Sequence, residues 1–268
     1  MPYFRTEDGC RLYYETIGME TTKPVIVFLN GTIQNTVHWK SQVNYLKDRY
    51  RLLLYDGRAQ GRSDLGEIPL GIDIHAADLS ALLRYLNIAK TNLVGSSHGA
   101  RVALETAVHY PHCVTRVAMC SISDRLNDRT CATLRIWRDI LATSGLEAAA
   151  WAMLPTVLGS AFLEENRRML PKIVKAIILR NRPASLLAHF DAMLADSRRL
   201  PPAVKAGSPA LVISGEQDPL VSPEGARRLA DQLGGTHVLM NGVGHTIQIE
   251  APDRLNRELD AFLMSEER

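Results

Sequence analysis

The chain has 268 residues, which is long enough to bury a large core in one domain without requiring a second. It carries 31 basic and 29 acidic residues, so no overall charge favours nucleic acid or a membrane surface as a partner. No run of about 18 apolar residues predicts a membrane span, and the N-terminal stretch lacks the pattern of a secretory signal. We therefore expect a globular, cytoplasmic protein.

Short apolar runs alternate with longer amphipathic stretches along most of the chain. This alternation is typical of a mostly parallel, twisted sheet with helices on both faces, so it predicts an α/β fold. Strands are expected at residues 11–17, 25–29, 51–55, 92–94, 114–120, 210–214 and 237–240. Helices are expected at residues 36–47, 72–86, 98–109, 223–233 and 252–263.

Residues 123–202 interrupt this alternation. Their sequence has helical periodicity throughout, with Gly and Pro between the segments and no alternating strand pattern. We interpret this stretch as an all-helical cap, inserted into a core made of residues 1–122 and 203–268.

A serine whose sequence context is typical of a catalytic nucleophile follows the predicted strand at 92–94. The segment from Gly95 to Gly99, GSSHG, has the pattern G-x-S-x-G, and an amphipathic helix begins directly after it. Such a serine lies on a sharp strand-to-helix turn, where small flanking residues are needed because neighbouring chain approaches closely. The pattern predicts Ser97 as a nucleophile, and a tight turn without chemistry is the alternative.

A serine hydroxyl is a weak nucleophile unless a base takes its proton. His245 is the best placed of the eight histidines, because it lies in a glycine-bearing loop between the last predicted strand and the last predicted helix. The side chain of His98 is expected to point away from its neighbour Ser97. The remaining histidines fit structural positions in predicted helices, a loop or a strand: His38, His75, His109, His112, His189 and His237.

The acid that orients the base is expected on the loop after the strand at 210–214. Asp218 lies on this loop and gives the chain order Ser, Asp, His, which distinguishes one serine-hydrolase architecture from the others. Glu216 on the same loop and Asp124, which follows the strand at 114–120, are the alternatives.

Acyl transfer also needs hydrogen-bond donors at the position where the oxyanion develops. We expect one donor to be the backbone N–H of His98, the residue after the nucleophile. The other is expected to be the backbone N–H of Thr32, in the loop that follows the strand at 25–29. This assignment depends on the position of the loop relative to the other motifs, since Asn-Gly-Thr also suits an ordinary turn.

Together these motifs resemble the α/β-hydrolase superfamily across nearly the whole chain. The resemblance rests on LNGT at 29–32, YDGRAQGRSD at 55–64, GSSHGA at 95–100, SGEQDPLV at 214–221 and GVGHTIQIEAP at 242–252. The turn at 56–63 departs from the superfamily pattern at Ala59 and Gln60, where Gly and His are usual. The resemblance implies the α/β-hydrolase fold and the serine-nucleophile esterase or thioesterase branch.

A second departure concerns Asn30, which stands where most members have histidine. In having asparagine at this position, the chain is similar to the synthases that transfer 3-hydroxyacyl groups to make rhamnolipid precursors. Esterases acting on pimeloyl-acyl carrier protein methyl ester and 3-oxoadipate enol-lactonases resemble the chain about as well. A serine at position 97 argues against the dehalogenases and epoxide hydrolases of the superfamily, which use aspartate there.

The leading hypothesis is hydrolysis of a carboxylic ester or thioester of an aliphatic acyl group through an acyl-Ser97 intermediate. The cap is rich in large apolar residues, and we expect Asn30, Ile33, Trp137, Trp151 and Phe190 to contact the substrate. The alternatives are acyl transfer to a hydroxyl of a second acyl chain, lactone hydrolysis, and ligand binding without catalysis.

No cluster of His, Cys or Asp has the spacing of metal ligands along the chain, so neither a metal nor an organic cofactor is expected. The four cysteines lack a C-x-x-C spacing, and we expect them to be structural thiols: Cys10, Cys113, Cys120 and Cys131.

Basic residues crowd into positions 167–182: Arg167, Arg168, Lys172, Lys175, Arg180 and Arg182. If this segment is one helix, Met169, Ile173 and Ile177 point inward and the basic residues point outward. Such a basic face could dock an acidic acyl carrier protein, and a solvated surface without a partner is the alternative.

Overall fold

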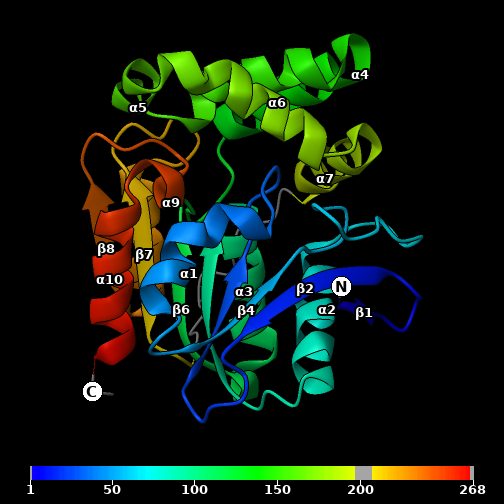
Figure 1. Cartoon of the computed structure of the whole chain (residues 1–268). Coiled ribbons are helices and arrows are strands. Elements are labelled where there is room, and N and C mark those ends of the chain that lie inside the picture. The colour runs from blue at the N-terminus through cyan, green and yellow to red at the C-terminus, as the bar shows by residue number, and fades with distance from the viewer. Residues whose placement is uncertain (1, 197–206, 266–268) are drawn as a thin grey trace.

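In the part of the chain that the structure describes, eight strands form one mostly parallel sheet (Figure 1). The computed structural model describes residues 2–196 and 207–265, and the predicted cap boundary at residues 202 and 203 lies outside the described residues. The strands are β1 (Tyr3–Arg5), β2 (Arg11–Ile17), β3 (Val25–Leu29), β4 (Arg51–Tyr55), β5 (Thr91–Ser96), β6 (Val114–Cys120), β7 (Ala210–Gly215) and β8 (Thr236–Met240). The seven predicted strands are confirmed, whereas the three-residue β1 was too short to give a periodic pattern.

The strands are arranged in the order β1-β2-β4-β3-β5-β6-β7-β8. The pairs β1–β2 and β2–β4 are antiparallel, and the other neighbours are parallel. The central strand β3, with the sequence VIVFL, is buried at every position. A strand that is apolar on both faces needs helices on both faces, which is the arrangement predicted from the alternating pattern.

Two apolar cores lie on opposite faces of this sheet. Leu79, Ala103 and Leu229 belong to one core, and Leu46 and Leu255 belong to the other. The first core is covered by α2 (Ile72–Tyr85), α3 (His98–His109) and α8 (Pro223–Leu233), and the second by α1 (Lys40–Leu46) and α10 (Pro252–Met264). Shorter segments are α9 (Ile247–Glu250), η1 (Thr36–Trp39) and η2 (Pro111–Cys113), so the helix predicted at 36–47 begins as a 3-10 turn.

A helical cap is inserted between β6 and β7. It consists of α4 (Asp128–Val157), α5 (Ser160–Glu165), η3 (Arg167–Met169), α6 (Leu170–Arg180) and α7 (Pro183–Ala195). Figure 1 shows these helices lying together over one end of the sheet, with α4 next to both α6 and α7. The predicted all-helical insertion is confirmed.

The longest cap helix, α4, meets the length and composition of a membrane-crossing helix. Gly145 interrupts it with non-helical dihedral angles, φ 82° and ψ 178°. Neither part of α4 then reaches the roughly 20 residues needed to span a bilayer. Buried α4 side chains such as Leu134, Trp137 and Met153 instead belong to the apolar core on one face of the sheet.

The basic segment of the cap is not a single helix, because the chain breaks between α6 and α7. Arg182 precedes Pro183 and has extended dihedral angles (φ −112°, ψ 130°), as steric contact with the proline ring favours. The prediction that Met169 points inward is wrong: it is 44% exposed, and Val174 and Ile177 are the buried residues of α6. The six basic side chains are exposed, as expected.

Two glycines allow α3 to lie directly against the sheet. A Cβ atom at Gly95 would lie 2.4 Å from the carbonyl oxygen of Gly99, and one at Gly99 would lie 2.3 Å from that of Leu29. These are backbone atoms, which cannot move aside as the end of a flexible side chain can. The G-x-S-x-G pattern therefore reflects a steric need on both sides of the serine.

We expect Gly99→Ala to lower the free energy of unfolding by roughly 3 kcal/mol, because the added methyl group would overpack a rigid backbone contact. Gly207→Ala is the control, since a Cβ there would meet no atom of the described residues within 4 Å. Urea denaturation of both variants measures the difference. Equal unfolding midpoints for the two variants would contradict the steric argument.

Candidate active site

Ser97 lies on the turn between β5 and α3 in a strained conformation. Its dihedral angles are φ 52° and ψ −115°, in a region that non-glycine residues rarely adopt. The backbone N–H of Ser97 donates to the Cys120 carbonyl oxygen at 2.8 Å, which ties the turn to β6. Such a conformation costs on the order of 1–3 kcal/mol and persists only where the surrounding structure enforces it, which is common at functional sites.

His245 and Asp218 form a buried charge-assisted pair. His245 Nδ1 lies 2.7 Å from Asp218 Oδ2. The other carboxylate oxygen of Asp218 accepts hydrogen bonds from the backbone N–H groups of Leu220 (2.8 Å) and Val221 (3.1 Å). These bonds fix the carboxylate, and the carboxylate in turn holds the proton on Nδ1 and leaves Nε2 as the free base nitrogen.

The pair also sets the basicity of the imidazole. Burial alone would lower the pKa of His245, but the charge of Asp218 and the hydrogen bond to it outweigh burial and raise the pKa above 6.5. A base with a raised pKa accepts a proton more readily, provided that it is still neutral at the working pH.

The two alternative acids are engaged elsewhere. A carboxylate oxygen of Glu216 accepts a hydrogen bond from the backbone N–H of Gly242 at 2.7 Å. Asp124 forms a two-pronged ion pair with Arg228 at 3.0 and 3.1 Å. The geometry therefore favours Asp218 over both as the partner of His245.

Ser97 and His245 line one cavity of about 130 Å³ between the sheet and the cap. Ile33, Trp137 and Phe190 also line it, and their predicted contact with a substrate stays a prediction. The aromatic rings of Trp137 and Phe190 pack with centroids 6.2 Å apart and form part of the apolar wall.

The structure does not place Asn30 or Trp151 at this cavity, which corrects their predicted contact with the substrate. Trp151 is 42% exposed on the surface of α4. The Asn30 side chain is buried, donates to the Tyr55 carbonyl oxygen and Asp56 Oδ1, and accepts from Trp39 Nε1 at 3.0 Å. Asn30 therefore holds the start of its loop, and both N–H donors of its amide are used within the protein.

The loop expected to carry the oxyanion donors is held by glutamines that the motifs did not single out. Gln34 Oε1 accepts from the backbone N–H of Gly31 (2.9 Å) and from Gln248 Nε2 (2.8 Å). Gln60 Nε2 donates to the Gly31 carbonyl oxygen at 2.9 Å. Gln60 stands where the superfamily turn usually has histidine, and that departure was the one signal of its role in the sequence.

The two expected donors lie at this same place. Thr32 and His98 both line the cavity with Ser97. His98 is the first residue of α3, where a backbone N–H has no acceptor within the helix. Their joint role as an oxyanion hole remains a prediction.

Glu250 holds the histidine loop and was not predicted. One of its carboxylate oxygens accepts from the backbone N–H groups of Gly244 (2.9 Å) and Gly159 (2.8 Å), and the other accepts from Thr246 (2.9 Å). The carboxylate thus joins both neighbours of His245 to the cap. Nothing in the periodicity or motifs indicated this link, because it joins residues far apart in the chain.

Three further histidines line the cavity. His75, His98 and His189 lie together on its wall, and one ring nitrogen of each lies within 4.8 Å of the others, a grouping that could hold a metal ion. We predicted structural positions in helices for His75 and His189, because spacing along the chain does not reveal a cluster made by distant segments.

We expect kcat/KM to rise with pH as His245 loses its proton, with an inflection above 6.5 because the pKa of His245 is raised. Asp218→Asn should shift this inflection to lower pH and reduce kcat by about 10⁴, since the amide favours the wrong histidine tautomer. A pH–rate profile measures both effects. Glu216→Gln and Asp124→Asn are matched controls, and a larger loss in either would transfer the role of Asp218 to that acid.

Comparison with known proteins places this site in a family. A model of the Alpha/beta hydrolase family matches residues 26–258. The 3-oxoadipate enol-lactonase 2 of Acinetobacter baylyi is 25% identical over 270 residues, covering 98% of each chain. A RutD hydrolase of Agrobacterium fabrum is 26% identical over 269 residues, covering 94% of this chain and 98% of its own.

Among solved structures, the enol-lactonase from Burkholderia xenovorans LB400 is similar with a TM-score of 0.89 and 27% identity. The match covers 98% of this chain and 100% of the enol-lactonase. The family match spans most of the chain and includes Ser97, Asp218 and His245. The protein therefore belongs to the alpha/beta hydrolase family.

Proposed function

We propose that the protein is a serine hydrolase that cleaves a carboxylic ester or a thioester of an aliphatic acyl group. The observation that carries this proposal is the buried His245–Asp218 pair, at 2.7 Å, on the same cavity as the strained Ser97. The enol-lactonases and RutD hydrolase to which the chain is similar support hydrolysis as the reaction.

In the first half of the proposed reaction, Ser97 Oγ attacks the carbonyl carbon of the substrate. Its proton passes to His245 Nε2, and the resulting imidazolium is stabilised by the Asp218 carboxylate on Nδ1. The carbonyl oxygen becomes an oxyanion that accepts hydrogen bonds from the N–H groups of Thr32 and His98. When the intermediate collapses, the bond to the leaving group breaks and His245 returns the proton to the leaving oxygen or sulfur.

In the second half, water takes the place of the leaving group. His245 Nε2 removes a proton from the water as its oxygen attacks the acyl carbon of acyl-Ser97. Collapse of this second intermediate breaks the ester bond to Ser97 Oγ, which recovers the proton from His245. The products are a carboxylic acid and the free enzyme.

The cavity wall supports an aliphatic acyl group as the substrate moiety. Trp137 and Phe190 present aromatic surface, and Ile33 and Met193 add aliphatic surface. Met193 Sδ accepts a hydrogen bond from Thr32 Oγ1 at 3.4 Å, so the cap and the loop that follows β3 meet beside the cavity. Apolar walls with few polar groups bind apolar chains by excluding water.

Two alternative reactions differ from this one. The first differs in the nucleophile that attacks acyl-Ser97, and the second differs in the fate of the leaving group. Acyl transfer replaces the water of the second half by a hydroxyl of another acyl chain, and it would yield an ester product. Lactone hydrolysis keeps the leaving hydroxyl on the product, and the similarity to two enol-lactonases favours this alternative. Product analysis by mass spectrometry separates free acid, new ester and opened lactone.

The basic face of the cap supports a finer proposal about the form of the substrate. The six basic residues between 167 and 182 are exposed on one segment of a chain whose formal net charge is only +2. An acidic acyl carrier protein could dock there and deliver its acyl chain to the cavity. Attraction of this kind is screened beyond about 8 Å at physiological ionic strength, so docking would weaken with salt.

We expect a fluorophosphonate probe to label the wild type at Ser97 and to leave Ser97→Ala unlabelled, as read by peptide mass spectrometry. On a panel of p-nitrophenyl esters of increasing chain length, Ser97→Ala and His245→Ala should each lose nearly as much kcat as the double variant, because the two residues act as a unit. Additive losses would exclude His245 as the base. Absence of labelling in the wild type would instead favour a ligand-binding protein.

If a carrier protein docks at this face, we expect Arg167→Glu/Arg168→Glu to lower kcat/KM for an acyl carrier protein substrate about tenfold at low salt. Electrostatic steering can change association rates by this amount. Activity on a small neutral ester should be unchanged. Arg227→Glu/Arg257→Glu changes the net charge equally on exposed residues outside the cap and is the matched control. Equal effects of both double variants, or none of the cap variant, would rule out docking at this face.

A further inference from the structure

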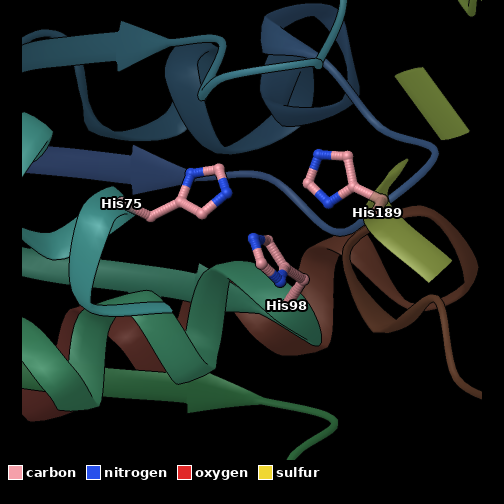
Figure 2. Close-up of side chains that lie close together, drawn as sticks. All are labelled: His75, His98 and His189. Carbon is pink, nitrogen blue, oxygen red and sulfur yellow. The ribbon is translucent and has the colours of Figure 1, made fainter. Parts of the chain in front are cut away.

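Three buried histidines from distant segments meet beside Ser97. His75 is on α2, His98 is the first residue of α3, and His189 is on the cap helix α7. They are 3%, 9% and 1% exposed, respectively. One ligand atom of each lies within 4.8 Å of the others, and Figure 2 shows each ring turning a nitrogen toward a shared centre.

The hydrogen bonds of these rings are incomplete in a way that points to a ligand. His75 Nε2 and His98 Nε2 are buried and have no hydrogen-bond partner among the described residues. Leaving a buried polar atom without a partner costs about 1–3 kcal/mol, so such atoms in a folded protein call for an explanation. Both lie in the cluster, where each is close to the other two rings.

His189 has a different and complementary arrangement. Its Nε2 lies 3.0 Å from the carbonyl oxygen of Arg58, and a carbonyl can only accept, so Nε2 carries the proton. The lone pair of His189 is then on Nδ1. Histidines that bind metals commonly donate the other ring N–H to a backbone carbonyl in this way, which fixes the tautomer and the ring orientation.

Burial favours the neutral form of each ring, and a neutral imidazole has a lone pair on one of its nitrogens. Burial lowers the pKa of His75 to about 3 and that of His189 to about 4, and burial also holds the pKa of His98 well below 6.5. Arg58 is a cation near the cluster, but its guanidinium forms ion pairs with Asp8 and Asp78. A neutral imidazole is the form of histidine that binds a metal ion.

We propose that His75 Nε2, His98 Nε2 and His189 Nδ1 bind a divalent transition-metal ion of the Zn²⁺ class. A tetrahedral zinc with bonds of 2.0–2.1 Å needs its ligand nitrogens roughly 3.4 Å apart. The ligand atoms are separated by up to 4.8 Å, so the three side chains must rotate to bring the nitrogens to that distance when the ion binds. Imidazole ligands favour Zn²⁺, Ni²⁺, Cu²⁺ and Co²⁺ over Mg²⁺ or Ca²⁺.

The position of this site has two consequences. Three protein ligands leave one coordination position, as in zinc sites that bind a water or substrate, and the three residues line the cavity that holds Ser97. A substrate oxygen, such as a carboxylate, can therefore take the fourth position. Because His189 belongs to the cap and the other two ligands belong to the core, the ion also fastens the cap over the cavity.

Titration of the purified full-length protein with Co²⁺ and Zn²⁺ tests the proposal. We expect one Co²⁺ per chain, with visible absorption bands of a four- or five-coordinate site, and displacement of Co²⁺ by Zn²⁺. His75→Gln and His189→Gln should each weaken the affinity at least tenfold. His109→Gln removes a histidine on the surface of α3, outside the cluster, and should leave the affinity unchanged.

Two results would overturn the site. One is absence of stoichiometric binding to the wild type, and the other is an affinity that responds equally to His109→Gln and to the cluster variants. If the cluster variants fail to fold, as judged by circular dichroism, X-ray absorption of the Zn²⁺-loaded wild type decides the matter. Imidazole ligands without sulfur support the site, whereas a sulfur ligand would assign the metal to a cysteine.

Discussion

The close approach of α3 to the sheet at Gly95 and Gly99 is the constraint on which the site depends. A Cβ atom at Gly99 would lie 2.3 Å from the Leu29 carbonyl oxygen, so the helix can reach the end of β3 only where no side chain intervenes. This contact brings Ser97 and the N–H of His98 to the loop that follows β3. The positive φ of Ser97 is a consequence of the same sharp turn, and the buried strands on either side maintain it.

Buried and half-buried polar side chains then hold the loops around this turn. Gln34 and Gln248 bond to each other, and Gln34 fixes Gly31 in the loop that follows β3. Glu250 accepts hydrogen bonds from the residues on both sides of His245. In a low-dielectric interior such bonds are strong when satisfied and costly when broken, so they position His245 and the loop after β3 more firmly than apolar packing would.

The core carries Ser97 and His245, and the cap forms part of the wall of the cavity that they line. Trp137 and Phe190 from the cap form part of the cavity wall, while Ser97 comes from the core. The bond from His189 to the Arg58 carbonyl oxygen joins α7 of the cap to the core. A cap that varies independently of the catalytic turn lets one fold act on many substrates, and specificity must therefore be argued from the cavity and not from the fold.

Local patterns were sufficient for the strands, the helical insertion and the motif around Ser97, because periodicity and turn chemistry depend on residues within a few positions of one another. The patterns were not sufficient for Asn30 and Trp151, since the face on which a side chain lies depends on which elements pack against it. They also gave no sign that His75 and His189 would meet. Those two residues belong to a core helix and a cap helix, and only the packing of the cap onto the sheet brings them together.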